Sequence, residues 1–108
     1  MSDLPQERAS IPIQLPALAL EALCRRHDIE RLALFGSVLR DDFTPESDVD
    51  VLVDFAPGVR LTLFGLARVQ NELSDVLGRR VDLHEGRSLH GAIRERVLQA
   101  ARQLYVAA

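Results

Sequence analysis

Apolar side chains recur along the chain with two different spacings, which predict two kinds of secondary structure. In some stretches they return every three or four residues, as on one face of a helix, and in others they alternate or form short β-branched runs, as in strands. The helical stretches are residues 16–27, 61–77 and 89 to about 105, and the strand-like stretches are residues 31–36, 48–55 and 80–84. The predicted order is helix, strand, strand, helix, strand, helix.

The first fifteen residues do not follow either spacing. They combine Pro5 and Pro12 with polar residues, so a loose or edge-lying lead-in is expected over residues 1–15. The remaining residues, 16–108, suit one compact domain, because the whole chain has 108 residues and a 47% apolar composition.

Composition then narrows the functional classes. The net charge is −3 and the pI is about 5.5, so no direct nucleic-acid partner is expected. All 13 basic residues are arginine, which excludes a P-loop lysine and a Schiff base. A single cysteine, no signal-peptide pattern and no apolar run of about 20 residues predict a cytoplasmic protein without a membrane segment.

A glycine–serine pair closes the first predicted strand. Gly36 lets the backbone approach an anion closely, and Ser37 adds a hydroxyl donor where a helix is expected to begin. Such a turn can hold a phosphate without lysine. Glycine–serine is also a common turn pair, so taken alone this feature favours an ordinary turn.

Two aspartates mark the start of the second strand, with ten residues between Ser37 and the first of them. Asp48 and Asp50 are two positions apart and therefore share a strand face, about 6.6 Å apart along the backbone. Carboxylates so close repel unless a cation lies between them, and paired Mg²⁺ ions with substrate phosphates satisfy both. An EF-hand is excluded by the valines and leucine that follow. A solvated edge strand is the alternative when the pair is considered alone.

Together the two motifs resemble a known family. The segments at residues 34–40 (LFGSVLR) and 47–53 (SDVDVLV) are similar to those of the polymerase-β-like nucleotidyltransferases, in particular the minimal nucleotidyltransferase (MNT) antitoxins encoded beside HEPN-domain toxins. The resemblance covers roughly residues 29–105. It implies an α+β fold with a short mixed sheet of three to four strands and helices packed on one face. It also implies that Gly36 and Ser37 hold ATP and that Asp48 and Asp50 bind two Mg²⁺ ions.

The family pattern requires a third carboxylate on a neighbouring strand, as a metal ligand that helps deprotonate the attacking hydroxyl. Asp82 is the expected residue, because it lies in a predicted strand with its apolar neighbours facing the other way. Asp54 is a rival, but about 13 Å of strand separates it from Asp50. Glu85 is a weaker rival, because it lies on the opposite strand face from Asp82.

Other polar residues receive lesser roles. Arg40, three residues after Ser37, is the expected cationic contact to the nucleotide, with pairing to a neighbouring aspartate as the alternative. His84 shares a strand face with Asp82, but an exposed histidine at the surface is the favoured interpretation. His90 is expected to be solvated, and Cys24 to be buried and inert.

The expected reaction is transfer of AMP from ATP. A chain of this size has no separate module to hold an acceptor, so the acceptor is expected to come from another protein. The resemblance implies a HEPN ribonuclease toxin modified on a tyrosine, with this chain as its antitoxin. Two alternatives stay open: an antitoxin that neutralises by binding alone, and a nucleotidyltransferase acting on a small molecule such as an aminoglycoside.

Overall fold

The computed structural model describes residues 13–39 and 43–107 and follows the predicted order of elements up to the last helix. The elements, in chain order, are α2 (Ala17–Arg26), β1 (Ile29–Phe35), the 3₁₀ turn η1 (Gly36–Leu39), β2 (Val49–Phe55), α3 (Leu63–Leu77), β3 (Val81–Glu85), the 3₁₀ turn η2 (Gly86–Ser88), α4 (Gly91–Ala100) and β4 (Arg102–Val106). In the described part of the chain, no helix has the length and apolar character needed to cross a lipid bilayer.

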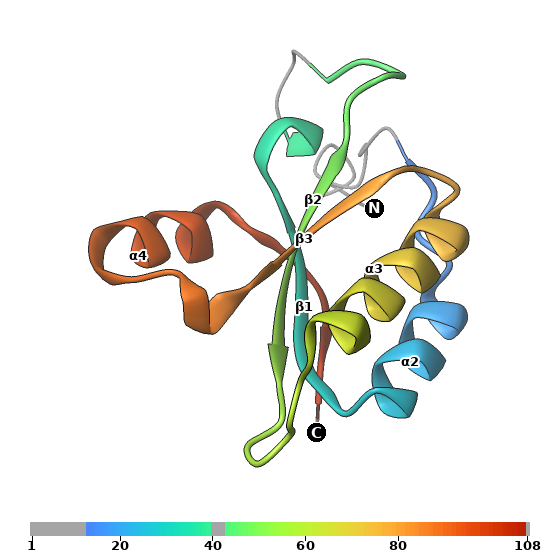
Figure 1. Ribbon diagram of the computed structural model, residues 1–108. Coiled ribbons are helices and arrows are strands. Elements are labelled where there is room, and N and C mark those ends of the chain that lie inside the picture. The colour runs from blue at the N-terminus through green and yellow to red at the C-terminus, as the bar shows by residue number, and fades with distance from the viewer. Residues whose placement is uncertain (1–12, 40–42, 108) are drawn as a thin grey trace, which may run out of the picture.

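The strands form one mixed sheet in the order β3-β2-β1-β4 (Figure 1). Strands β1 and β2 run antiparallel, as do β1 and β4, whereas β2 and β3 run parallel. The connection between the two parallel strands contains α3, as a parallel crossover requires. This arrangement confirms the expected α+β class with a short mixed sheet.

The alternation of β2 divides the sheet into an apolar and a polar face. Val49, Val51 and Val53 are fully buried and belong to one core cluster with leucines of α2 and α3, such as Leu23 and Leu73. Helices α2 and α3 lie side by side on this face (Figure 1). Asp50, which stands between Val49 and Val51, consequently lies on the other face of the sheet.

Helix α3 is capped at both ends. The Thr62 hydroxyl accepts a hydrogen bond from the Gly65 amide at 3.0 Å, and Gly78 ends the helix in the left-handed conformation with φ +66°. Glu72 on α3 accepts from Arg26 at 2.7 Å and lies 2.9 Å from His27 at the end of α2. The hydrogen bond from Arg26, followed by that from His27, lowers the pKa of Glu72. These contacts join the two helices at their outer surface.

The C-terminal segment differs from the prediction. The expected helix from Leu89 to about Tyr105 is instead a shorter α4 followed by strand β4, which pairs with β1. Apolar residues near the end of the chain fit either spacing, and without β4 the edge of β1 would leave its amides and carbonyls unpaired. Hydrogen bonding to that edge therefore decides the conformation of residues 102–106.

Helix α4 also lies apart from the other two helices. It is on the opposite side of the sheet from α2 and α3 (Figure 1), so only two of the three helices share the expected face. At the other end of the described chain, Ile13 and Leu15 of the predicted lead-in pack against the core. Residues 1–12 lie outside the described part.

Candidate active site

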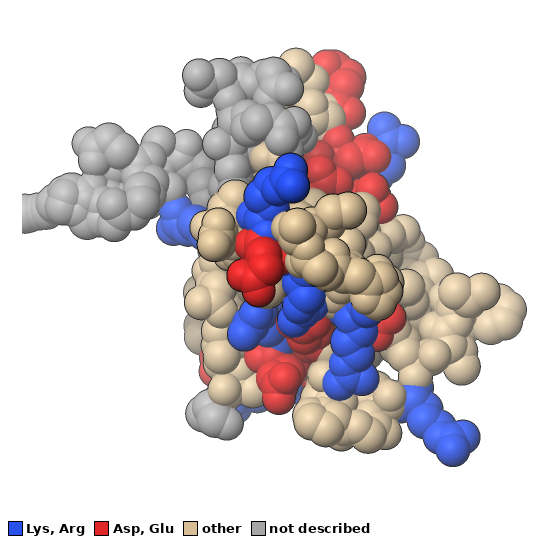
Figure 2. Space-filling model, turned by 90° about the vertical axis from the view of Figure 1, so that its left-hand side faces the viewer, with Lys and Arg blue, Asp and Glu red and all other residues tan. Residues whose placement is uncertain are grey.

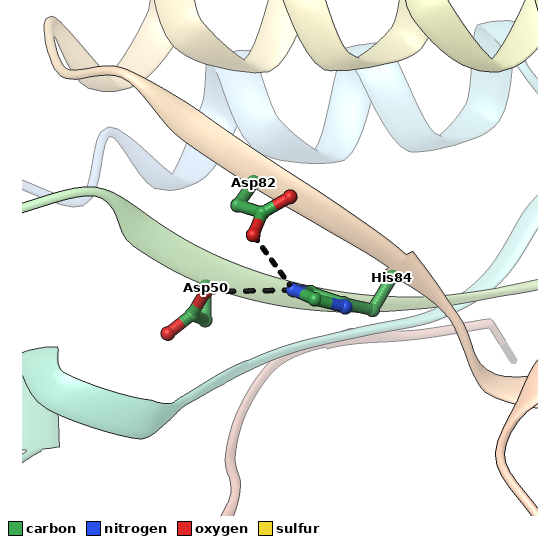
Figure 3. Close-up of side chains that lie close together, drawn as sticks. All are labelled: Asp50, Asp82 and His84. Carbon is green, nitrogen blue, oxygen red and sulfur yellow. Dashed lines mark ion pairs between the residues drawn. The ribbon is translucent and has the colours of Figure 1, made fainter.

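The parallel pairing of β2 with β3 brings two aspartates side by side. Asp50 is the register partner of Asp82, and Leu52 is the partner of His84, two residues further along each strand. Residues that are partners in a parallel pair share a sheet face, as do positions i and i+2 along one strand. All three polar side chains therefore lie on the face that the valines leave free (Figure 3).

These side chains form a compact cluster. The His84 Nε2 atom lies 3.2 Å from an Asp82 carboxylate oxygen and 3.4 Å from an Asp50 oxygen (Figure 3). One donor atom from each residue fits within a span of 4.8 Å. The side chains are 27% exposed for Asp50, 35% for His84 and 53% for Asp82, so a solute can reach the cluster from one side.

His84 lies in the cluster, whereas the sequence favours an exposed surface position for this histidine. Its ring packs edge-on against Phe35, with centroids 5.1 Å apart and an angle of 69° between the ring planes. The side chain is half-buried rather than a free surface group. Its position two residues after Asp82 gave the available signal, because it puts both side chains on one strand face.

Gly36 directly follows the last residue of β1 and lies beside this cluster. It adopts φ +78°, and a Cβ there would lie 2.3 Å from an Asp50 carboxylate oxygen. Glycine is favoured at this position, because a Cβ would displace the Asp50 carboxylate and the positive φ strains any other residue. The following helix is the short turn η1, which contains Ser37, rather than a longer helix. Arg40 lies outside the described residues.

Asp48 does not join the cluster. It lies just before β2 with its side chain 47% exposed, and it pairs with the Arg80 guanidinium at 2.9 Å. Arg80 is itself 77% exposed, and an ion pair between such exposed groups contributes at most about 1 kcal/mol, so it exchanges easily. The structure thus brings together two of the three predicted carboxylates and places the third beside an arginine.

The segment before Asp48 is held in place by Arg79. One nitrogen of its guanidinium donates to the carbonyls of Thr44, Pro45 and Ser47, each at 3.1 Å. The guanidinium also lies over the Phe43 ring at 4.7 Å, in cation–π contact. These contacts fix the chain where it enters β2.

Asp54 lies at the far end of β2 and does not approach the cluster. It is 9% exposed and lies 4.0 Å from Arg94 of α4. Gly86 packs so closely that a Cβ would lie 2.1 Å from an Asp54 oxygen. Arg94 also donates to the Gly86 carbonyl. This rival carboxylate therefore joins α4 and η2 to the sheet.

The donor set suits a divalent cation. Two carboxylates and an imidazole are common metal ligands, and carboxylate oxygens are those that Mg²⁺ prefers. The His84 Nε2 atom is also buried without a hydrogen bond of acceptable geometry among the described residues. On the side of the molecule that carries α4, acidic side chains gather at the upper right and arginines spread over the centre (Figure 2).

Comparison with known families shows to which class of protein this four-stranded mixed sheet, with its paired acids beside a glycine turn, belongs. Residues 17–104 match the model of the nucleotidyltransferase domain. The chain belongs to this family, which confirms the resemblance and the enzyme class predicted from the two motifs.

Individual relatives show which members of the family this chain is similar to. The protein adenylyltransferase MntA of Thermococcus cleftensis is 36% identical over 77 residues, which cover 71% of this chain and 76% of the relative. A solved structure assigned to the minimal nucleotidyltransferases is 39% identical, with a TM-score of 0.66 and coverage of 93% of this chain and 94% of that one.

A third similarity is structural. A complex of a tri-AMPylated Shewanella oneidensis HEPN toxin with its MNT antitoxin has a chain of the same fold, with a TM-score of 0.60 at 22% identity. The match covers 84% of this chain and 70% of that chain.

Proposed function

We propose that this protein transfers AMP from ATP to a tyrosine hydroxyl of a HEPN-type toxin and so acts as its antitoxin. The observation that carries this proposal is the pairing of Asp50 with Asp82 across β2 and β3, beside the Gly36 turn. The names of the relatives, a protein adenylyltransferase and an MNT antitoxin bound to an AMPylated toxin, support the same substrate and partner.

Asp50 and Asp82 would hold the metal, and Asp48 would join them by leaving Arg80. Two Mg²⁺ ions bound there would neutralise the triphosphate and lower the pKa of the attacking hydroxyl. The Gly36 backbone would lie against the phosphates, since no side chain occupies that position. Ser37, the next residue, is proposed to contact the nucleotide as well, and Arg40 to contact the phosphates.

The bond changes follow from this placement. The acceptor oxygen forms a bond to the α-phosphorus while the bond between the α-phosphorus and the bridging oxygen breaks, and pyrophosphate leaves. The hydroxyl proton passes to the Asp82 carboxylate, which is the most exposed acid of the cluster at 53%. Its exposure lets a large acceptor reach it and then lets the proton pass to solvent.

The test begins with a search for a HEPN-type gene beside the gene of this protein. The product of that gene is then incubated with this protein, ATP and Mg²⁺, and the intact masses of both chains are measured. A gain of one AMP mass, or a multiple of it, on the partner is expected. Replacement of the partner's reactive tyrosine by phenylalanine should remove the gain. An unchanged partner mass under saturating ATP would overturn the proposal.

A matched variant separates catalysis from binding. Asp48→Ala with Asp50→Ala should abolish both the mass gain and the protection of growing cells from the toxin. Protection that persists in this variant would support neutralisation by binding alone. AMP transfer to an aminoglycoside in place of the protein would instead support the small-molecule alternative.

A further inference from the structure

The His84 imidazole occupies the space between the two carboxylates of the proposed metal site. We propose that His84 is itself a ligand of the cation held by Asp50 and Asp82, and that its nitrogen makes this site favour Mn²⁺ over Mg²⁺. This inference rests on the proposed function, since it concerns the cation that would serve the transfer. It adds a residue that the aspartate pattern alone does not include.

The distances between donor atoms match those around one ion. Ligands that bind an octahedral cation at about 2.1–2.2 Å lie about 3 Å from their neighbours in the coordination sphere. The His84 nitrogen lies 3.2 Å from an Asp82 oxygen and 3.4 Å from an Asp50 oxygen. Small adjustments of the side chains therefore suffice to place all three donors on one ion.

The histidine is oriented for this role. Contact with Phe35 holds the ring edge-on, and the Nε2 atom points toward both carboxylates rather than toward solvent (Figure 3). That atom is buried, yet it makes no hydrogen bond of acceptable geometry within the described residues. Its nearest described polar neighbours are the two carboxylate oxygens, and a metal ion bound between the three donors would satisfy this nitrogen and both oxygens together.

The chemical type of the donor atoms determines which metal ion the site binds more tightly. Mg²⁺ takes oxygen ligands and keeps several waters, whereas imidazole nitrogen suits the first-row transition metals. Mn²⁺ accepts both oxygen and nitrogen donors and is close to Mg²⁺ in its coordination geometry. A site with two carboxylates and one imidazole is therefore expected to bind Mn²⁺ more tightly than a site made of carboxylates alone.

One competing interpretation makes the opposite prediction. If His84 is only a cation that balances two carboxylates in the metal-free protein, it competes with the metal for the same position. Its removal would then strengthen the binding of every divalent ion. If His84 is a ligand, its removal weakens Mn²⁺ binding and changes Mg²⁺ binding much less.

The experiment compares three variants of the full chain. His84→Ala removes the nitrogen, and His84→Gln supplies an amide oxygen of similar reach. His90→Ala is the matched control, because His90 is exposed at the start of α4, away from the cluster. Mn²⁺ binding is followed by the EPR signal of the free ion, and Mg²⁺ binding by displacement of Mn²⁺. Thermal melts check that each variant folds.

His84→Ala should lower the affinity for Mn²⁺ by about tenfold or more, with a change in Mg²⁺ affinity below about threefold. His90→Ala should match the wild type, and His84→Gln should keep Mg²⁺ binding but lose the advantage of Mn²⁺. Tighter Mn²⁺ binding in His84→Ala, or an equal loss for both ions, would overturn the inference.

A spectroscopic measurement on the wild type avoids reliance on the variants. With ¹⁵N-labelled histidine, pulsed EPR of bound Mn²⁺ should show coupling to one imidazole nitrogen, which persists in His90→Ala. Absence of this coupling contradicts the role of His84 even if AMP transfer occurs. Coupling without AMP transfer would refute the proposed function and leave the metal ligand in place, so the two failures are distinguishable.

Discussion

The two faces of the sheet are made by the same strands but are stabilised in different ways. On one face, valines of β2 meet leucines of α2 and α3 in a core whose buried residues are at most 8% exposed. On the other face, two carboxylates and an imidazole lie within 4.8 Å of one another and stay partly open to solvent. Apolar burial on the first face stabilises the fold, whereas the close carboxylates on the second face repel each other and destabilise it.

This difference shows how a chain of this size can hold a reactive site. The buried valines of β2 determine the position of this strand in the sheet and so fix the backbone positions from which its aspartates extend. The side chains can adjust, but their backbone cannot move without disturbing the core. The comparison therefore predicts that changes on the polar face alter chemistry with little loss of stability, and that changes on the apolar face do the reverse.

Asp50→Asn tests the polar face and has the largest expected effect. The substitution removes a proposed metal ligand and one of two adjacent charges, so AMP transfer to the partner should fall by about 10³-fold or more. The melting temperature should stay equal or rise, since repulsion with Asp82 is relieved. Labelled ATP measures transfer, and calorimetry measures stability. Asp75→Asn, on the exposed surface of α3, is the control and should change neither.

Leu73→Ala tests the apolar face. Leu73 is fully buried, so its truncation should lower the free energy of unfolding by about 2–5 kcal/mol. Below the melting temperature, AMP transfer per folded molecule should be unchanged. Urea denaturation measures the stability loss, and Leu63→Ala, at a position 84% exposed, should cost less than about 0.5 kcal/mol. A comparable loss at both positions would contradict the division between buried and exposed leucines.

Cys24 gives the apolar face a pH dependence. Burial raises the pKa of this thiol from its ordinary value of 9.0 to about 11. The folded protein thus keeps a proton that the unfolded chain releases, so stability should fall as pH rises from about 9 to 11, by about 2 kcal/mol.

Few other groups obscure this change, because the chain has no lysine and one tyrosine. Denaturation at a series of pH values measures it, with Cys24→Ala as the control that should show a flatter profile. A thiol that reacts rapidly with iodoacetamide at pH 8 in the folded protein would refute the assigned burial.

Gly36→Ala tests the edge of the polar face, where the glycine turn meets Asp50. Both Gly36 and Gly58 have positive φ, at +78° and +89°, so alanine at either should cost about 1 kcal/mol. Only at Gly36 does the new Cβ meet Asp50, at 2.3 Å, whereas nothing lies within 4 Å at Gly58. Gly36→Ala should therefore also lower metal affinity and AMP transfer, by about tenfold. Equal metal affinity in the two variants would show that Asp50 tolerates displacement.

Much of the fold could be predicted because its signals are local. Helix α3 follows from its leucine spacing and the glycine at its end, and β2 from the alternation of valine with aspartate. Strand β4 could not be predicted in this way. The spacing of its residues predicts the end of a helix, whereas their pairing with β1 is a contact between distant parts of the chain.

The candidate site could likewise be predicted only in part from the sequence. The glycine–serine pair at Gly36 and the aspartate pair of Asp48 and Asp50 are present in the sequence and sufficed to indicate a nucleotidyltransferase, and the family pattern then pointed to Asp82. Which acids meet was decided by the tertiary structure, because the register of β2 against β3 pairs Asp50 with Asp82 and leaves Asp48 beside Arg80. The same register carries His84 into the cluster. Local spacing determines the face of a strand on which a side chain lies, but only pairing between distant strands determines its neighbours.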